Sequence, residues 1–353
     1  MNVTFVYRYL TLGGVEVVLR SRMHALPAIG IQPSVWFLAD GQGRSLFADC
    51  AQRVRIGDLR SLEEHLRDTG VDVLSVIDTP DALESLAGAP HRPKVVLEVH
   101  TPYAENRTYL RSPAIRMADT IFVPSEHQRQ IVLRETSRPP EVVVVPNPIG
   151  GAFEAPLEIP GPVVGAPIVA WVGRLDWLKN WGSFLRVAGR VSRLVPEAEF
   201  WVVGSGTVGE EAEFERYCRR SSAMRRLRWL RGQPHATMPR LFDEIRASGG
   251  VVVSTSRGES FGMAVAEAMA RGCAVVAPRC GPFTEFIADG VEGSLYQPGR
   301  EAEASEAVVS LLSDLRRRQR LGAKAREMIL RSHATDVALE ALALALKAVE
   351  TRS

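Results

Sequence analysis

The sequence predicts an α/β fold made of two domains of similar size, each built on a parallel sheet. Short apolar runs alternate with amphipathic helical stretches, which is the pattern of repeated strand–helix–strand units. The chain has 353 residues, and single hydrophobic cores stop growing near roughly 250–300 residues. Prolines and glycines cluster near the middle of the chain, where two domains would join.

Six apolar segments of the first half are predicted to be strands. The first ends at a Gly13–Gly14 turn, and an expected helix follows over about residues 15–28. A second helix is expected at Leu59–Asp68. The predicted strands are Val3–Tyr7, Pro33–Leu38, Val71–Ile77, Val95–Val99, Thr120–Pro124 and Val142–Val145.

Residues 151–166 are predicted to be the linker between a first domain, 1–150, and a second domain that begins at residue 167. Three prolines and three glycines lie inside this segment, and Gly150 and further prolines flank it. Proline removes a backbone donor and glycine weakens regular structure, so we expect neither a helix nor a central strand here.

The second half repeats the α/β pattern and then becomes helical. The last 50 or so residues are rich in Ala, Leu and Arg, with no glycine after Gly322. Because open parallel sheets bind ligands at the carboxyl ends of their strands, we expect a small-molecule site in a cleft between the domains. The predicted strands are Ile168–Val172, Phe200–Val203, Leu227–Leu230, Val251–Thr255 and Ala274–Ala277.

Composition excludes several classes of function. The formal net charge of +2 argues against a non-specific nucleic-acid binder, which needs a basic excess. We see no signal peptide and no apolar run approaching the ~20 residues of a spanning helix, and acidic residues interrupt the basic stretch at 53–68. The four cysteines have no metal-ligand spacing. We therefore expect a cytoplasmic protein that does not bind nucleic acid, a membrane or a metal ion.

Lysine is rare in this chain, which makes one loop conspicuous. Of 43 basic residues only four are lysines, a bias typical of a GC-rich coding sequence. One of them, Lys179, follows the predicted strand 168–172, five residues after Arg174. Two cations at the carboxyl end of a strand suit a diphosphate and the charge that develops when it leaves.

The segment Ser254–Gly272 is the most informative stretch of the sequence. A strand leads into a polar loop, Phe261–Gly262 turns the chain, and strong helix formers begin at Met263. The free amides of that helix start would attract an anion. Glu267 lies among apolar residues of this helix, and a buried carboxylate needs a hydrogen-bond partner. Glu259 lies in the loop before the turn.

One motif supports a different function. Residues 204–209 match the glycine pattern G-x-G-x-x-G of dinucleotide-binding folds. The motif follows the second strand of its domain rather than the first, and residues 224–232 contain no acid to bind a ribose. An NAD(P)-dependent oxidoreductase therefore stays open as an alternative.

The segment from Glu259 to Glu267 resembles the E-x7-E motif of retaining glycosyltransferases of family 4, which have the GT-B fold. Further motifs that resemble those of this family occur along nearly the whole chain, in the same order as in the family. It includes Gly-Arg174-Leu-x-x-x-Lys179-Asn, Gly204-x-Gly206, Gly281-Pro-Phe-Thr-Glu285, Leu12-Gly-Gly-Val-Glu16, His100, Pro124-Ser125-Glu126 and Val145-Pro-Asn147.

This resemblance implies two Rossmann-like domains facing a cleft, with a second domain over 167–332 and a last helix, 333–353, returning to the first domain. It also implies the site residues. Catalytic roles fall to His100, Glu259, Arg174 and Lys179; donor binding to Gly14, Arg174, Lys179, Glu259, Phe261, Gly262, Met263, Ala264 and Glu267; acceptor binding to Tyr9, Glu16, His100 and Tyr103. Contacts with the base are expected near residues 231–239.

The implied function is transfer of a sugar, with retention, from a nucleoside-diphosphate sugar to a small, soluble acceptor. UDP or GDP is the expected nucleotide, and neither a metal nor a further cofactor is expected. The expected mechanism is front-face attack, in which a donor phosphate oxygen takes the acceptor's proton. Another alternative is a GT-B protein that binds a nucleotide-linked cyclitol or sugar without ordinary glycosyl transfer.

Overall fold

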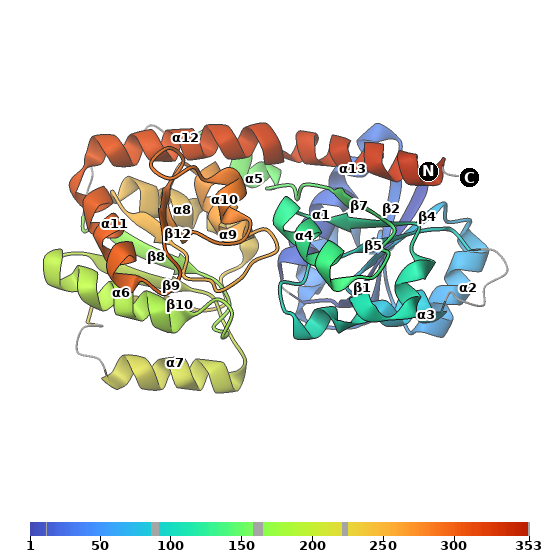
Figure 1. Cartoon of the computed structure of the whole chain (residues 1–353), viewed down its shortest axis with the longest axis horizontal. Helices are drawn as coiled ribbons and strands as arrows, with labels where there is room; N and C mark the ends of the chain where they lie inside the picture. Colours follow the sequence, from blue (N-terminus) through green and yellow to red (C-terminus); the bar gives the residue numbers. More distant parts are fainter. Residues whose placement is uncertain (12, 86–91, 158–164, 221–224, 352–353) are drawn as a thin grey trace. The chain divides into compact units, whose positions relative to one another are not determined.

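The computed structural model describes residues 1–11, 13–85, 92–157, 165–220 and 225–351, which form two compact units (Figure 1). The N-terminal unit comprises Met1–Gly150 and Ser332–Ser353, and the C-terminal unit comprises Gly151–Arg331. Leu12 of the quoted motif and residues 158–164 of the predicted linker lie outside the described residues.

The N-terminal unit is built on a seven-stranded, wholly parallel sheet with the order β3-β2-β1-β4-β5-β6-β7. All six predicted strands are present. Sequence patterning missed β3, because three residues are too few to show an alternation. The strands are β1 (Asn2–Tyr9), β2 (Gln32–Ala39), β3 (Val54–Ile56), β4 (Val73–Ile77), β5 (Lys94–Glu98), β6 (Thr120–Val123) and β7 (Glu141–Val144).

Helices cover both faces of this sheet. On one face α1 and α13 share an apolar core with β1, β2 and β4, and on the other face the core includes Leu62 of α2, Leu83 of α3 and Val132 of α4. The helix expected over 15–28 ends as α-helix at Ala25, because Pro27 follows, and continues as a 3₁₀ turn. The elements are α1 (Gly14–Ala25), η1 (Leu26–Ile29), η2 (Gln42–Arg53), α2 (Leu59–Thr69), α3 (Pro80–Ser85), η4 (Glu105–Arg111), η5 (Pro113–Met117), α4 (Glu126–Glu135) and α13 (Thr335–Glu350).

The C-terminal unit contains a six-stranded parallel sheet with the order β10-β9-β8-β11-β12-β13. The five predicted strands are present, and the three-residue β13 was missed for the same reason as β3. The strand expected over 251–255 ends at Val253, where the chain enters the loop described below. The strands are β8 (Ile168–Val172), β9 (Glu199–Val203), β10 (Leu227–Leu230), β11 (Val251–Val253), β12 (Ala274–Pro278) and β13 (Ser294–Tyr296).

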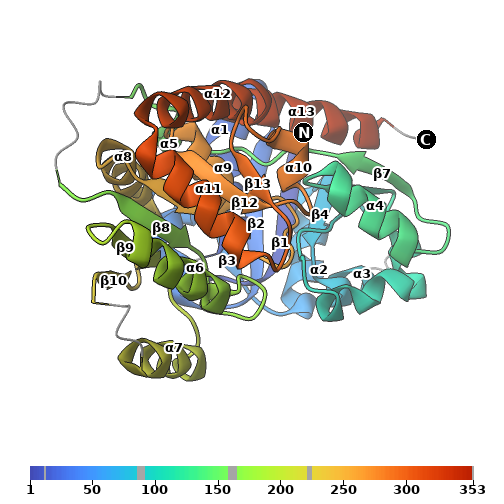
Figure 2. The ribbon, with the colours of Figure 1, turned by 60° about the vertical axis from the view of Figure 1, so that its left-hand side comes forward.

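Helices α6 and α11 lie side by side on one face of the second sheet and share its core (Figure 2). Helices α8 and α9 contact each other and the strands β11 and β12. The two parallel Rossmann-like sheets confirm the predicted fold class. The helices are α5 (Gly151–Glu154), α6 (Trp181–Leu194), α7 (Val208–Arg220), η7 (His235–Thr237), α8 (Met238–Ala247), α9 (Met263–Ala270), α10 (Phe283–Phe286), α11 (Glu301–Ser313) and α12 (Leu315–His333).

The expectation that the predicted linker holds no helix is wrong for its first residues. Residues 151–154 form the short helix α5, although the segment was expected to hold no helix. These four residues include no proline, and Phe153 is buried against Phe242 of α8. Burial of one aromatic side chain therefore orders the start of the segment.

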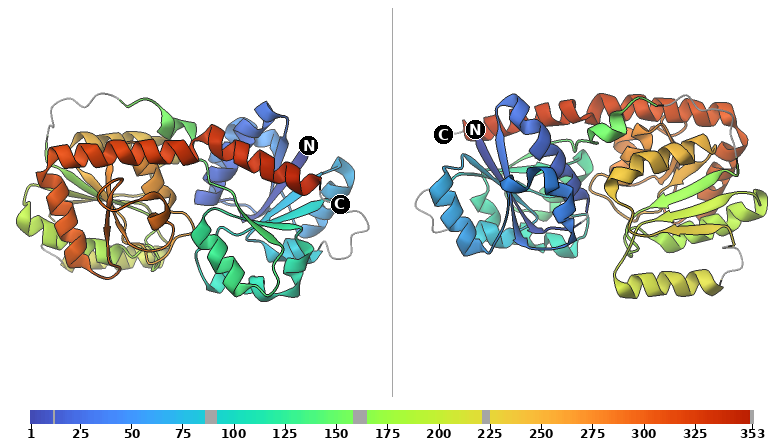
Figure 3. Two further views of the ribbon diagram at one scale, coloured as in Figure 1. Left: turned by 45° about the horizontal axis from the view of Figure 1, so that its top comes forward. Right: turned by 180° about the vertical axis from the view of Figure 1, so that it is seen from behind.

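The last helix belongs to the N-terminal unit. Figures 1 and 3 show α13 lying along that unit, and its contacts include α1, β4 and β5. Its apolar face is part of the same core as β1 and β2. This confirms the expected return of the C-terminal helix to the first domain. Among the described residues, no helix is both long enough and apolar enough to cross a bilayer.

Two leucines of α13 provide a matched test of this packing. Leu342 is 1% exposed and Leu344 is 63% exposed on the same helix. We expect Leu342→Ala to destabilise the N-terminal unit by about 2–5 kcal/mol through lost burial and a cavity. Leu344→Ala should change its stability by less than about 0.5 kcal/mol. Hydrogen exchange of the β1 and β4 amides measures both, and equal effects would contradict the assignment of α13 to this core.

The junction between α12 and α13 should respond to acid. His333 is tied to the first domain through Nδ1 and the Asn147 carbonyl, 3.3 Å apart. Burial lowers the pKa of His333 from 6.5 to about 4. Between these two pKa values, His333 binds a proton in the unfolded chain but not in the folded chain. The free energy of unfolding therefore decreases as the pH falls below 6.5.

We expect His333→Gln to remove this acid sensitivity. At pH 5 the wild type should lose about 1–2 kcal/mol more, relative to pH 7.5, than the variant does. The melting temperature of each protein at the two pH values measures the difference. An identical loss in wild type and variant would show that His333 does not cause it.

Candidate functional site

Two loops of the C-terminal unit meet at the carboxyl ends of the adjacent strands β8 and β11. The Arg257 amide donates to the Leu178 carbonyl at 2.8 Å, and Asn180 Nδ2 donates to the Thr255 carbonyl at 3.1 Å. The side chain of Trp171 on β8 contacts the second loop, because its Nε1 donates to Thr255 Oγ1 at 3.0 Å. The loop after β8, which was predicted to bind a diphosphate, and the loop before α9 are therefore joined by hydrogen bonds.

Lys179 and Glu259, predicted independently from the two loops, are direct partners. Lys179 Nζ lies 2.6 Å from Glu259 Oε1 and 2.8 Å from Oε2. Ser256 Oγ donates to the same Oε1 at 2.8 Å. The carboxylate is buried and the ammonium is partly exposed. The pair holds one cation and one hydrogen-bond acceptor in fixed positions at the strand ends.

Arg174 lies at the rim of the same loop. Its Nη2 is 3.1 Å from Asp176 Oδ2, and its side chain is largely exposed. Asp176 also accepts the Lys179 amide through Oδ1 at 2.8 Å, so one carboxylate orders the turn that carries both cations. The exposure of Arg174 leaves its guanidinium accessible to an anionic ligand.

The helix start at Met263 has the form that the sequence predicts. Gly262 caps α9 with a φ of +94°, a conformation that side chains disfavour, and a Cβ there would lie 2.6 Å from the Phe283 ring. The amides of Met263 and Ala264 precede the first bonds of the helix, which run from Val265 and Ala266 to the Gly262 carbonyl. Phe261 is buried beside Phe286 and anchors the turn.

Glu267 has a partner that the sequence did not reveal. It is buried on α9, and its Oε1 lies 2.9 Å from Nε2 of His235. The ring of His235 packs on Phe153 of α5, with centroids 5.1 Å apart. His235 falls in the loop expected to contact the base, but no spacing linked it to a residue 32 positions later.

The glycines at 204–206 have a structural role. A Cβ at Gly204 would lie 1.9 Å from the Gly173 carbonyl oxygen, and the Leu175 amide donates to the Ser205 carbonyl. At the start of α7 the Thr207 amide donates to Glu210 Oε2, and the Gly206 amide donates to Glu211 Oε1. Two carboxylates thus occupy the anion-binding end of the helix, where a dinucleotide's phosphates would have to bind.

In the N-terminal unit, His100 follows β5 and is buried. Its Nε2 lies 2.8 Å from Glu98 Oε2, and its amide donates to Asp78 Oδ2 at 3.1 Å. Glu98 was not singled out by the sequence. A signal was present, because a carboxylate in an apolar strand, two residues before a histidine, lies on the same face of the sheet.

The other predicted residues of this unit lie at the end of β1 or near β5. Tyr9 ends β1 and is 53% exposed, and Gly14 is the first residue of α1. Glu16 is buried, and its Oε1 accepts the Thr11 amide at 2.7 Å and also the Thr11 hydroxyl. That carboxylate is therefore engaged in holding the loop between β1 and α1. Tyr103 lies in the loop after His100, where its amide donates to Thr101 Oγ1 at 3.3 Å.

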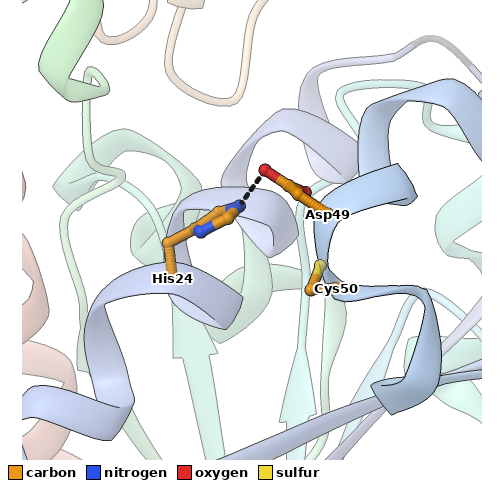
Figure 4. Close-up of side chains that lie close together, drawn as sticks. All are labelled: His24, Asp49 and Cys50. Carbon is orange, nitrogen blue, oxygen red and sulfur yellow. Dashed lines mark ion pairs between the residues drawn. The ribbon is translucent and has the colours of Figure 1, made fainter.

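A further group of possible metal ligands lies elsewhere, between α1 and η2. His24, Asp49 and Cys50 bring one ligand atom each to within 4.8 Å of one another (Figure 4). Asp49 also contacts Arg20 at 3.4 Å, and burial raises the pKa of the Cys50 thiol. A guanidinium on the carboxylate and a protonated thiol both oppose cation binding.

Two family models match the chain and together span most of it. "Glycosyl transferases group 1" matches residues 157–328, and "Glycosyltransferase Family 4" matches residues 12–150. The first covers the loops after β8 and β11 described above, and the second covers most of the unit that contains His100.

Curated relatives include D-inositol 3-phosphate glycosyltransferases of Corynebacterium aurimucosum and Kribbella flavida. That of Corynebacterium aurimucosum is 27% identical over 259 residues, which are 67% of this chain and 60% of the relative. That of Kribbella flavida is 32% identical over 46% of this chain and 39% of its own. The chain thus matches 60% or less of the length of these relatives.

Solved structures show the same fold over the full chain. HepE of Anabaena, in complex with UDP and glucose, is 20% identical with a TM-score of 0.83, covering 99% of this chain and all of its own. Sucrose-phosphate synthase of Thermosynechococcus elongatus is 17% identical with a TM-score of 0.80, covering all of both chains. These likenesses and the two parallel sheets show the GT-B fold. The two matched models, which together span most of the chain, show that it belongs to glycosyltransferase family 4, the glycosyl transferases group 1.

Proposed function

We propose that this chain is a retaining glycosyltransferase that moves a sugar from a UDP-sugar to a hydroxyl of a small acceptor. The observation that carries the proposal is the Lys179–Glu259 pair beside the start of α9. It places a cation, a carboxylate acceptor and free helix amides together at the strand ends, which is the chemistry that a nucleoside-diphosphate sugar requires.

The diphosphate binds to Arg174, Lys179 and the amides of Met263 and Ala264 in this proposal. Two positive side chains and a helix start stabilise the charge that develops on the departing diphosphate. The positive charge for this step comes from the protein, so the reaction requires no metal ion. Glu259, neutralised by Lys179 before binding, is left to accept hydroxyl groups of the sugar.

Glu267 binds the ribose hydroxyls in this proposal. Its Oε1 is held by His235, which leaves the other carboxylate oxygen for a ribose hydroxyl. Uracil is the proposed base because HepE was solved with UDP. GDP is the competing nucleotide, and direct binding measurements separate the two.

The acceptor binds to the N-terminal unit, at Tyr9, Tyr103 and His100, in this proposal. Glu16 contributes by fixing the loop before α1. The names of the two curated relatives favour a phosphorylated cyclitol as the first acceptor class to test. Transfer proceeds on the front face of the sugar, and a phosphate oxygen of the donor takes the acceptor's proton.

The oxidoreductase alternative loses its main support in the structure. The glycine motif that suggested it packs against the Gly173 backbone, and the following helix start is occupied by Glu210 and Glu211. Two carboxylates at that position repel a pyrophosphate.

A nucleotide panel with one buried substitution tests the donor assignment. We expect UDP to raise the melting temperature more than GDP, ADP or NADPH does. Glu267→Gln should weaken UDP binding at least about ten-fold, because it removes the anionic acceptor for a ribose hydroxyl. Glu327→Gln, at an exposed glutamate of α12, is the control and should leave binding unchanged. Stabilisation by NADPH alone would refute the transferase assignment.

The rare lysine provides a second test. We expect Lys179→Met to reduce kcat/KM for a UDP-sugar by about 10²–10³-fold, because a cation that stabilises the leaving diphosphate is lost. Lys324→Met removes an exposed lysine that pairs with Glu327 and should retain full activity. Donor hydrolysis and transfer to inositol phosphate are both measured. If the Lys179 variant kept wild-type rates, the lysine would have no role in the reaction.

A further inference from the structure

Glu267 carries a carboxylate into an otherwise apolar part of α9. Its neighbours from Val265 to Ala270 are valine, alanine and methionine, and all of them are buried. Glu267 is itself only 6% exposed. A carboxylate in such surroundings needs a hydrogen-bond donor, because burial of an unpaired charge strongly disfavours folding. Among the residues that the structure describes, that donor comes from a single side chain, His235.

The hydrogen bond engages only one of the two carboxylate oxygens. His235 Nε2 lies 2.9 Å from Glu267 Oε1, and because a carboxylate only accepts hydrogen bonds, the proton between them is on the histidine. Oε2 has no hydrogen-bond partner in the described part of the chain, and it is not one of the buried, unpaired polar atoms there. One oxygen is therefore held, and the other is left to accept a hydrogen bond from a ligand.

The ring of His235 is in turn held by an aromatic contact. It packs on Phe153 of α5, with centroids 5.1 Å apart, and Phe153 also packs against Phe242 of α8. His235 begins the 3₁₀ turn η7 immediately before α8, and the Thr237 amide donates to the Pro234 carbonyl across this turn at 2.9 Å. Both the ring and the backbone of the histidine are thus fixed, so it can hold the carboxylate in one orientation.

Arg271 joins the three helices that carry these residues. It directly follows α9 and is 4% exposed, and its Nε and Nη2 donate to Asp243 of α8 at 3.0 and 2.7 Å. Its Nη1 donates to the carbonyl of Ala155, the residue after α5, at 2.8 Å. Because one buried guanidinium bonds to all three elements, the glutamate, the histidine and the phenylalanine keep fixed relative positions.

We propose that His235 is a positioning residue for ribose recognition, whose hydrogen bond to Oε1 orients the Glu267 carboxylate so that Oε2 accepts a ribose hydroxyl. This inference rests on the proposed function for the identity of the ligand. A glutamate side chain loses rotamer freedom when it binds a ligand, and a carboxylate that is already held pays less of that entropy on binding. The contribution of His235 to affinity is therefore confined to nucleotides that carry ribose hydroxyls.

Binding of UDP and of 2′,3′-dideoxy-UDP tests this proposal, and no acceptor is needed. His235→Phe keeps an aromatic ring against Phe153 and removes the hydrogen-bond donor. We expect its affinity for UDP to fall about ten-fold, whereas its affinity for the dideoxy analogue should change by less than about two-fold. Isothermal titration calorimetry measures both affinities. If the ratio of the two affinities stayed at the wild-type value in this variant, the proposal would be overturned.

A second variant separates the hydrogen bond from the ring contact. His235→Gln keeps an N–H donor and loses the ring, so it should lower the melting temperature but keep most of the preference for UDP over the dideoxy analogue. An equal loss of preference in His235→Gln and His235→Phe would show that ring packing is what matters, and would refute the positioning role.

His65→Phe is the matched control. His65 of α2 is a partly exposed histidine that also packs on an aromatic ring, that of Trp36, with centroids 5.3 Å apart. It lies in the N-terminal unit, away from Glu267. This substitution should leave the affinities for UDP and for the dideoxy analogue unchanged, and a loss of preference as large as that of His235→Phe would overturn the proposal.

Glu267→Ala distinguishes failure of this inference from failure of the proposed function. If Glu267→Ala removes the preference for UDP and His235→Phe keeps it, only the role of His235 is wrong. If the wild type does not bind UDP, or Glu267→Ala keeps the preference, the ribose contact in the proposed function is wrong and the role of His235 falls with it. Loss of the preference in both variants, with no further loss when they are combined, supports action of His235 through Glu267.

Discussion

The ion pair between Lys179 and Glu259 is the interaction on which the candidate donor site depends. It links two loops that leave neighbouring strands of one sheet, and a backbone hydrogen bond from Arg257 to Leu178 fixes the same contact. Parallel strands direct their carboxyl ends to one edge, so loops far apart in sequence become neighbours there. The opposite charges then neutralise each other in the unliganded protein. Under the proposed function, a diphosphate on Lys179 competes with a carboxylate already in place, which favours ligands that also offer hydroxyl groups to Glu259.

Local sequence patterns predicted most of the fold. Strand positions followed from runs of apolar residues, and among the described strands only β3 and β13, whose three residues include a polar one, were missed. The start of α9 was predictable because Gly262 and the helix formers after it act within one turn of chain. The helix α5 was not, because it depends on the burial of Phe153 by residues far along the sequence.

The partners of the site residues were harder to predict than the residues themselves. Glu267 and Lys179 could be chosen from residue type and position, since a carboxylate in an apolar helix and a rare lysine in a loop are unusual on their own. Their partners depend on tertiary contacts: His235 reaches Glu267 across 32 residues and Glu259 reaches Lys179 across 80. Each unit consequently contains a buried glutamate paired with a histidine, Glu98 with His100 and Glu267 with His235, and only the second glutamate was expected.

The return of α13 to the first sheet has a consequence for synthesis of the protein. The C-terminal unit is one continuous segment, whereas the N-terminal unit takes its last core residues, such as Leu342 and Leu346, from the end of the chain. During translation the C-terminal unit therefore has its whole core available before the N-terminal unit does. The first 150 residues emerge from the ribosome with an apolar face that stays uncovered until α13 has been synthesised. Emergence of α13, rather than emergence of the first 150 residues, is therefore the event that lets the N-terminal core close.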